Sequence, residues 1–271
     1  MPRHNAKDAT EALTLTPIAI TRSCFADKFG VPRQPGLTRH AHADLLIQPP
    51  FDREDAFRGL ESASHLWLTF QFHQAVRADW RPVVRPPRLG GNRKIGVFAS
   101  RSPFRPNSLG LSVVRNRGLV RKQGKLVLQI SDHDLIEGTP ILDIKPYLPF
   151  ADSISGAHLG WAEDAPVERL PVVFLPEAQQ QLAELCKEDS PEQSLENTSK
   201  SFSENSLKNS PQKYPDFAAL IEDVVSYDPR PSFRRGREEE RIYGAHLYDV
   251  NVRFRFVIDE TGSRVEVLTV C

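Results

Sequence analysis

The chain has 271 residues, 39% hydrophobic and 26% charged, which is enough to bury one large or two modest hydrophobic cores. Its 35 basic and 35 acidic residues cancel, so the composition excludes a protein that binds nucleic acid or membranes through net charge alone. The three cysteines, Cys24, Cys186 and Cys271, form neither a disulfide framework nor a metal motif. With no apolar leader segment and no long apolar run, these features predict a cytoplasmic protein without a membrane span.

The first part of the chain alternates strand-like segments with proline-rich loops. Residues 1–12 are polar and predict a disordered tail, whereas residues 13–25 alternate as a first strand. Residues 45–51 predict a second strand, and residues 53–67 begin with helical spacing before a glycine interrupts them. Residues 66–74 are apolar on both faces, which is typical of a buried central strand.

The stretch GVFASRSPFRPNSLG, residues 96–110, is unlike a helix or a plain strand. Pro103 and Pro106 remove two backbone donors and fix two φ angles, which predicts a stiff loop. This loop presents Arg101 and Arg105, and arginine suits flat anionic or π-faced partners. Rigid loops on a scaffold often carry binding residues, although a basic surface loop without a function is the alternative interpretation.

Basic residues are concentrated immediately before this loop. Arg77, Arg81, Arg85, Arg88, Arg93 and Lys94 are accompanied by one acid, Asp79. Such a local patch can follow phosphates even on a protein without net charge, although charge runs are also common on solvated faces.

The second part of the chain predicts further strands and then a smaller unit. Residues 109–132 predict two strands joined by a turn near Gly124, and a strand at 167–176 followed by a helix is expected to complete the first unit at residue 186. Residues 187–213 contain too few large apolar residues to offset their ordering entropy, which predicts a disordered linker. The remaining 214–271 predict an amphipathic helix, which ends before Asp228, and a hairpin turning at residues 260–262. We expect this short unit to pack on the first one or on a partner subunit.

No nucleophile and base, phosphate-binding glycine motif or hydrolytic carboxylate pair is evident. His40 and His42 stand near Asp44 and could begin a metal site, which leaves a metal hydrolase as one alternative. No further His or Cys follows at ligand spacing, so we expect no metal. Polar loops around residues 32–34, 101–107 and 137–139 would form a mixed-charge pocket if they met at one end of an antiparallel barrel. Such a pocket suits a reaction that is catalysed mostly by positioning.

Six segments in order, PRQPG, HLWLTFQFHQ, RPPRLGG, GVFASRSPFRPNSLG, EGTPILDIKPYLPF and DPRPSFRRG, resemble the TrmO (TsaA-like) family of tRNA methyltransferases. The resemblance implies a mainly β (α+β) fold with a single-sheet antiparallel β-barrel. It further implies S-adenosylmethionine as methyl donor, a homodimer, and N6-methylation of threonylcarbamoyladenosine beside the anticodon of a threonine tRNA. The domains would be a barrel at 13–186 that binds S-adenosylmethionine and a C-terminal α+β domain at 214–271, joined by the linker.

The resemblance also assigns site residues. One position departs from the family pattern, because Glu137 stands where an aspartate is expected. The residues expected to bind S-adenosylmethionine are Pro32, Arg33, Gln34, His73, Gln74, Arg101, Leu111, Asp134, Glu137, Gly138, Thr139 and Pro140.

The acceptor nitrogen is a poor nucleophile, so we expect a positioned base or hydrogen-bond acceptor near it. Asp143 and Asp228 are the candidates, with Lys145 and Tyr147 as orienting groups. A non-catalytic RNA-binding adaptor with the same barrel is the alternative function, and it would not need S-adenosylmethionine. The residues expected to contact tRNA phosphates are Arg85, Arg88, Arg105, Arg230, Arg234 and Arg235.

Overall fold

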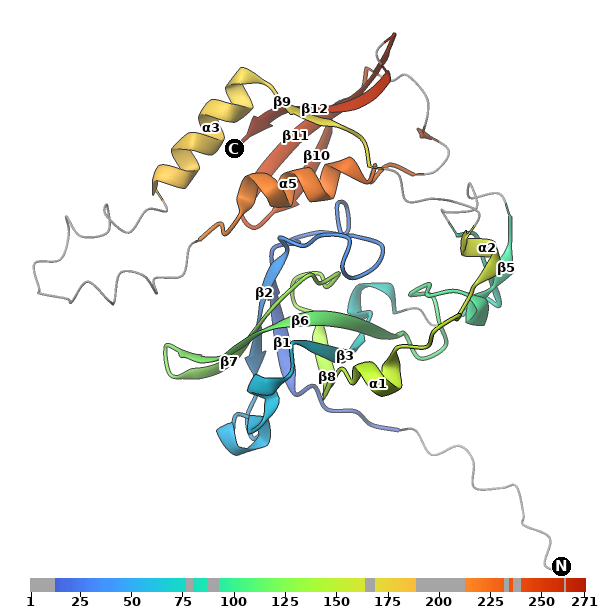
Figure 1. The fold of residues 1–271 in the computed structure, drawn as a ribbon, viewed down its shortest axis with the longest axis vertical. Helices are drawn as coiled ribbons and strands as arrows, with labels where there is room; N and C mark the ends of the chain where they lie inside the picture. Colours follow the sequence, from blue (N-terminus) through green and yellow to red (C-terminus); the bar gives the residue numbers. More distant parts are fainter. Residues whose placement is uncertain are drawn as a thin grey trace, which may run out of the picture.

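The protein is described from a computed structural model, in which two mainly β units pack together (Figure 1). The structure describes residues 13–76, 80–86, 93–163, 169–188, 213–231, 234–235, 240–260 and 262–271. The predicted tail at 1–12 and nearly all of the predicted linker at 187–213 lie outside the described residues. Each unit has its own cluster of buried apolar residues, and the predicted mainly β class with few helices is confirmed.

The first unit is a six-stranded antiparallel sheet that closes on itself, because the last strand pairs with both the third and the first. Alternate residues of the central strand, Leu66, Leu68 and Phe70, fill the interior. The strands, in spatial order, are β1 (Ala19–Ser23), β2 (His42–Ile47), β7 (Lys125–Ser131), β6 (Leu109–Lys122), β3 (His65–Gln71) and β8 (Pro140–Pro146).

Local sequence explains where these strands turn and end. The predicted hairpin is confirmed: β6 and β7 are joined by Gln123 and Gly124, whose φ angles of 50° and 79° are those of a two-residue type I′ turn. The helix expected after residue 53 is replaced by two short 3₁₀ turns, η1 (Glu54–Phe57) and η2 (Leu60–Ser62), because Gly59 between them has a φ of 91°. The first strand is also shorter than the alternation at 13–25 predicted.

The second unit, in the part of the chain that the structure describes, is a four-stranded sheet with two helices. The predicted helix and hairpin are confirmed as α5 (Phe217–Ser226) and as the β11–β12 pair. The sheet order is β10 (Tyr243–Leu247), β11 (Val250–Asp259), β12 (Gly262–Val270) and β9 (Val172–Phe174), with α3 (Pro176–Glu188) packed beside it.

The strand at 172–174 and the helix after it belong to this second unit, so the prediction that they complete the first unit is wrong. β9 pairs in parallel with β12, and Leu175 N donates to Val267 O at 2.9 Å. Ala178 and Leu182 of α3 are buried in the C-terminal core. A parallel strand pair separated by so much chain leaves no local signal in the sequence, which is why residue periodicity could not assign it.

The described residues of the connection between β3 and β6, 72–76, 80–86 and 93–108, are largely irregular, as the prolines and glycines of this connection predict. It begins with a single 3₁₀ turn, η3 (His73–Ala75), and contains a two-residue ladder between β4 (Val83–Val84) and β5 (Ile95–Gly96). A further 3₁₀ turn, η5 (Val97–Ala99), opens the proline loop that follows. After β8 the chain forms two four-residue helices, α1 (Pro149–Asp152) and α2 (Gly160–Glu163).

Residues 24–41, between β1 and β2, form the contact between the two units. Cys24 and Phe25 are buried in the C-terminal core, and Tyr248 N donates to Cys24 O at 2.7 Å. On α5, the buried carboxylate of Asp223 accepts from Arg39 N at 2.9 Å. The C-terminal unit therefore packs on the first unit, as expected, and it holds the loop that carries residues 32–34.

Strand pairing brings three connections to one end of the closed sheet, which we call the loop end. Gln71 at the end of β3 pairs with Leu109 at the start of β6, and Phe70 pairs with Ile141 near the start of β8. Ser23 N at the end of β1 donates to the Glu137 carboxylate at 2.6 Å. The loops at 24–41, 72–108 and 132–139 therefore share this end. Among the described helices, none is long and apolar enough to span a membrane.

Close packing inside the closed sheet yields a stability prediction. A Cβ added at Gly110 would overlap the ring of Phe70, whereas one added at Gly96 meets no atom within 4 Å. We expect Gly110→Ala to lower the free energy of unfolding by about 1–3 kcal/mol, because an overpacked core must shift. Urea denaturation of both variants checks this, and equal stabilities for Gly110→Ala and the Gly96→Ala control would contradict the packing.

Candidate functional site

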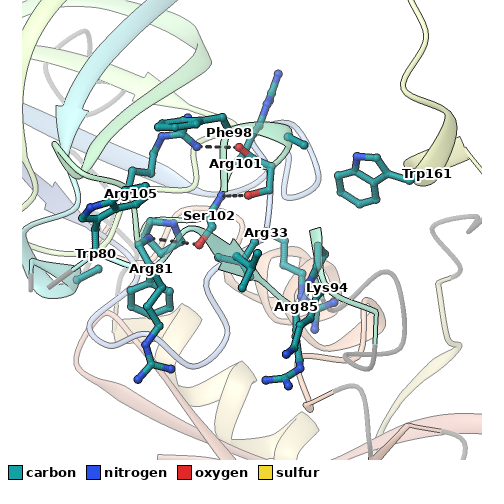
Figure 2. A pocket seen from close by; sticks show the side chains of 18 of the residues that line it. Arg33, Trp80, Arg81, Arg85, Lys94, Phe98, Arg101, Ser102, Arg105 and Trp161 are labelled. Carbon is teal, nitrogen blue, oxygen red and sulfur yellow. Dashed lines mark hydrogen bonds between the residues drawn. The ribbon is translucent and has the colours of Figure 1, made fainter. Parts of the chain in front are cut away.

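A cavity of about 1080 Å³ opens at the loop end (Figure 2). It is built by residues 33–34, by the β3–β6 connection and by the start of α2. Among the described residues that line it none is acidic, so the cavity is positively charged. Its cationic residues are Arg33, Arg81, Arg85, Lys94, Arg101 and Arg105, and its aromatic residues are Trp80, Phe98, Phe104 and Trp161.

Arg105 holds the proline loop in shape. Its Nη1 donates to Ser100 O at 2.7 Å and to Val97 O at 3.4 Å, and its guanidinium lies 5.9 Å from the centre of the Phe98 ring. Ser100 Oγ also donates to Val97 O at 2.8 Å. These contacts hold one nitrogen of the guanidinium within its own loop, which gives Arg105 a role in fixing the loop.

Arg101 joins two of the three loops. Its Nη1 donates to Gln34 Oε1 at 2.7 Å, which links the proline loop to residues 32–34. Neighbouring Arg33 is partly buried, and burial followed by the nearby Arg235 lowers its pKa to about 10, so it remains a cation at neutral pH. Residues 32–34 and 101–107 therefore meet, which is the condition under which the sequence predicted a pocket. The cavity beside them is lined by cations, however, and not by mixed charges.

The third loop closes onto β1. The Glu137 carboxylate accepts from Arg22 Nη1 at 2.8 Å as well as from Ser23 N, so this residue anchors the turn. Gly138 N donates to Thr21 O at 3.0 Å, and Thr21 Oγ1 donates to Thr139 O at 3.0 Å. With the extra methylene of glutamate, the carboxylate of Glu137 still reaches both of its donors, Arg22 Nη1 and Ser23 N. Pro140 begins β8 opposite Ile20 of β1.

His73 lies beside this turn. A Cβ at Gly138 would lie 3.9 Å from His73 Nε2, and the φ of Gly138 is 75°, a conformation that favours glycine. His73 Nδ1 is buried without a hydrogen-bond partner among the described residues. Burial, and then the charge of Lys28, hold the pKa of His73 below its usual value. The imidazole is therefore mostly neutral at neutral pH, and its Nδ1 is closed off from solvent in this structure. The next residue is fixed through its backbone, because Lys28 Nζ donates to Gln74 O at 2.7 Å.

Asp134 is a carboxylate held between the sheet interior and the loop end. Ser112 Oγ, from the inner face of β6, donates to Asp134 Oδ1 at 2.6 Å. Burial raises the pKa of Asp134 to about 6, against the opposing effects of this hydrogen bond and of Arg101. The group is ionised at neutral pH and can accept from an ammonium or a ribose hydroxyl.

The structure corrects the roles expected for Asp228 and Arg230. Arg230 donates Nε and Nη2 to the two carboxylate oxygens of Asp228 at 2.8 Å each, and its guanidinium lies 3.7 Å from the centre of the Phe256 ring. Arg230 is only 2% exposed. A buried, doubly bonded pair supplies neither a free base nor a phosphate contact, and it acts as a structural link near Arg33, whose Nη2 donates to Arg230 O at 3.4 Å.

The other arginines expected to contact tRNA have different surroundings. Arg85 lines the cavity, whereas Arg88 lies outside the described residues. Arg235 is partly buried and donates to Asp228 O at 2.6 Å, and Arg234 N donates to Pro231 O at 2.9 Å.

Four of the expected site residues lie on the outer face of the closed sheet and do not line the cavity: Leu111, Asp143, Lys145 and Tyr147. Thr69 of β3 pairs with Leu111 on one side and with Asp143 on the other, so these residues form one row across three strands. Asp143 is ion-paired with Lys145, which stands next along the same face. Tyr147 is near the far end of β3, where its ring lies 5.8 Å from that of Trp67.

The two histidines considered as a metal site are paired elsewhere. His40 Nδ1 lies 2.9 Å from Asp223 Oδ2, and His42 Nε2 lies 3.5 Å from Asp216 Oδ2. The described residues contain no group of three or more potential metal ligands.

Two aromatic residues of the cavity, Trp80 and Trp161, were not predicted as site residues from the sequence. Trp80 stands directly before Arg81 in the basic run, which is a local signal of an RNA-binding loop that could have been recognised. Trp161 comes from a segment more than fifty residues beyond the proline loop, and nothing near it in the sequence indicates a site.

Comparisons with known proteins show the family of the chain. Residues 20–153 match the family described as the tRNA-methyltransferase O N-terminal domain, and residues 192–270 match the TrmO C-terminal domain. The tRNA (adenine(37)-N6)-methyltransferase of Escherichia coli (strain K12) is 42% identical over 248 residues, which cover 92% of this chain and 94% of that protein. The enzyme of the same name from Eikenella corrodens is 40% identical over 72% of this chain and 91% of its own.

A crystal structure of TrmO from Pseudomonas aeruginosa superposes with a TM-score of 0.70 at 35% identity and covers 96% of this chain and 99% of its own. Fold, cavity and sequence thus place the chain among the tRNA methyltransferases. Within that class, it belongs to the TrmO family, and the resemblance seen in the sequence is confirmed.

The surroundings of Asp134 predict a pH-dependent stability. The pKa of Asp134 is about 6 in the folded protein, above its ordinary value of 3.8, so the folded state favours the neutral acid over the carboxylate. The neutral acid therefore adds to the free energy of unfolding at low pH, and this contribution is lost as the pH rises through 6. Asparagine carries no such penalty. Between pH 4 and pH 8 we expect the unfolding free energy of Asp134→Asn, relative to wild type, to shift in the variant's favour by roughly 1–3 kcal/mol. Urea titrations at both pH values check this, and a difference independent of pH would contradict it.

Proposed function

We propose that this chain is the S-adenosylmethionine-dependent methyltransferase that N6-methylates threonylcarbamoyladenosine next to the anticodon of threonine tRNA. The observation that carries the proposal is the meeting of three polar loops at one end of the closed sheet, beside a cavity with six cationic and four aromatic side chains. Family membership over most of the chain supports the same reaction class. The closed sheet is the methyltransferase domain in this proposal.

The polar groups at the loop end fit S-adenosylmethionine. Arg101 supplies a cation for its carboxylate, and Asp134 an anion for its ammonium or ribose. The backbone of the turn at Gly138 and Thr139, with the imidazole of His73 beside it, is suited to its adenine and ribose. When bound, the donor supplies an electrophilic methyl group on a sulfonium centre.

The chain's own contribution is to position the acceptor and to exclude water. Methyl transfer from a sulfonium is an in-line displacement that loses charge, so a dry and preorganised site matters more than an acid. Glu137 and Arg105 serve this by fixing the two loops around the reacting groups. Asp143 is the remaining candidate for the hydrogen-bond acceptor of the substrate N–H, with Lys145 and Tyr147 orienting it.

A homodimer would explain why those residues lie on the outer face. The described part of β6 and the segment after β8 expose Leu111 at 54%, Leu148 at 41% and Phe150 at 86%. Exposed apolar surface of this kind is typical of an interface between subunits. We place the second copy against this face, so that Asp143 and Lys145 lie at the interface.

The RNA lies across the cavity, where Arg81, Arg85 and Lys94 contact phosphates of the anticodon arm in this proposal. The neutral overall charge makes this local patch, and not the whole surface, the determinant of binding. We place the protein in the cytoplasm, where tRNA is modified. The alternative, an adaptor without turnover, has no use for a donor site.

The proposal is tested by incubating the protein with radiolabelled S-adenosylmethionine and tRNA from a strain that lacks the activity, followed by nucleoside analysis. We expect label in N6-methyl-threonylcarbamoyladenosine. Arg101→Ala should raise the dissociation constant for S-adenosylmethionine by roughly tenfold or more, because a charge-assisted contact is lost.

Arg121→Ala is the matched control, since Arg121 is an exposed arginine paired with Glu54 at the opposite end of the sheet. Wild-type protein that binds no donor would favour the adaptor. Equal donor affinity in the two variants would remove Arg101 from the site.

A further inference from the structure

Two aromatic side chains of the cavity are half exposed or more, although they are large and apolar. Trp80 is 50% exposed and Phe98 is 71% exposed, and their ring centres lie 6.2 Å apart at an interplanar angle of 33°. They therefore form one apolar wall instead of two isolated residues. Exposed aromatic groups in a concave site, away from the core, are typical of a binding surface.

A third aromatic residue lines the cavity from another element. Trp161 belongs to the short helix α2 and also lines the cavity. Figure 2 shows its ring apart from the wall of Trp80 and Phe98, with the loop of Arg101 and Ser102 between them. The cavity thus has aromatic surfaces on two sides, contributed by segments far apart in the chain.

The charges of the same cavity restrict its occupant. Arg81, Arg85 and Lys94 line it, and no described lining residue is acidic. An apolar peptide would leave these cations without partners, and a free phosphate would leave the aromatic faces bare. Unpaired nucleotides satisfy both, because each carries a π-face and a phosphate. A volume of about 1080 Å³ also leaves room for a nucleotide beside a bound donor.

We propose that Trp80, Phe98 and Trp161 are stacking surfaces for unpaired bases of the RNA substrate, a role that rests on the function proposed above. The bases stack on the two aromatic walls, while Arg81, Arg85 and Lys94 contact the adjoining phosphates. Stacking holds a base by its face and leaves its edge free, which is what a reaction at N6 requires. The aromatic residues thereby position the acceptor, and the donor occupies the polar groups of the three loops.

The test measures affinity for an anticodon stem-loop RNA over a range of salt concentrations. Trp80→Ala and Trp161→Ala should each weaken binding by roughly tenfold at every salt concentration and leave the salt slope unchanged, since stacking releases no counterions. Trp80→Phe should retain most of the affinity. Arg85→Gln should instead reduce the slope. Val173→Ala, which trims an exposed apolar residue of β9 outside the cavity, is the control and should bind as wild type does.

Tryptophan fluorescence gives a second readout, because the chain has three tryptophans and Trp67 lies outside the cavity. In Trp67→Phe protein, only the two cavity tryptophans emit, and RNA should quench their emission. Adding Trp80→Phe or Trp161→Phe to this protein should remove part of the quenching. The proposal would be overturned if Trp80→Ala and Trp161→Ala bound RNA with wild-type affinity. It would also be overturned if these variants had a reduced salt slope, or if they lost only their binding of S-adenosylmethionine. Methyl transfer by the wild-type protein is scored separately, so failure of the stacking role is distinguishable from failure of the proposed function.

Discussion

The antiparallel pairing of β3 with both β6 and β8 is the constraint on which the site depends. A strand paired antiparallel on both sides places its own end beside the starts of its neighbours. Gln71 therefore meets Leu109, and Phe70 meets Ile141, so the loops after β3 and before β8 are forced to the same end. Alternating burial along β3 fixes this register, because a one-residue slip would turn Leu66, Leu68 and Phe70 out of the core.

The C-terminal unit completes this arrangement by holding the loop at 24–41. Phe25 is buried in its core, and the carboxylate of Asp223 accepts a hydrogen bond from Arg39 N. The buried pair of Asp228 and Arg230 lies at the same contact. Separating the two charges of a buried ion pair lowers the stability of the fold strongly, because each charge is left buried without a partner. These groups therefore specify one placement of the loop. The second unit thus fixes the loop that carries residues 32–34.

The sequence predicted what depends on local patterns and missed what depends on distant contacts. The hairpin at Gly124 and helix α5 follow from turn residues and periodicity, and the structure has them. The pairing of β9 with β12 and the position of Trp161 join residues far apart in the chain, which no local pattern encodes. Asp228 pairs with Arg230 only two residues further along the chain, but the burial of this pair against Phe256 is set by folding, and the sequence does not show it.

Hydrogen–deuterium exchange of the full chain, with and without S-adenosylhomocysteine, tests the central claim that the loop end is the donor site. The claim predicts added protection in residues 24–41, 97–108 and 132–139, and none at the β6–β7 turn on Gln123 and Gly124 at the opposite end. Protection confined to that turn, or spread evenly over the closed sheet, would contradict it.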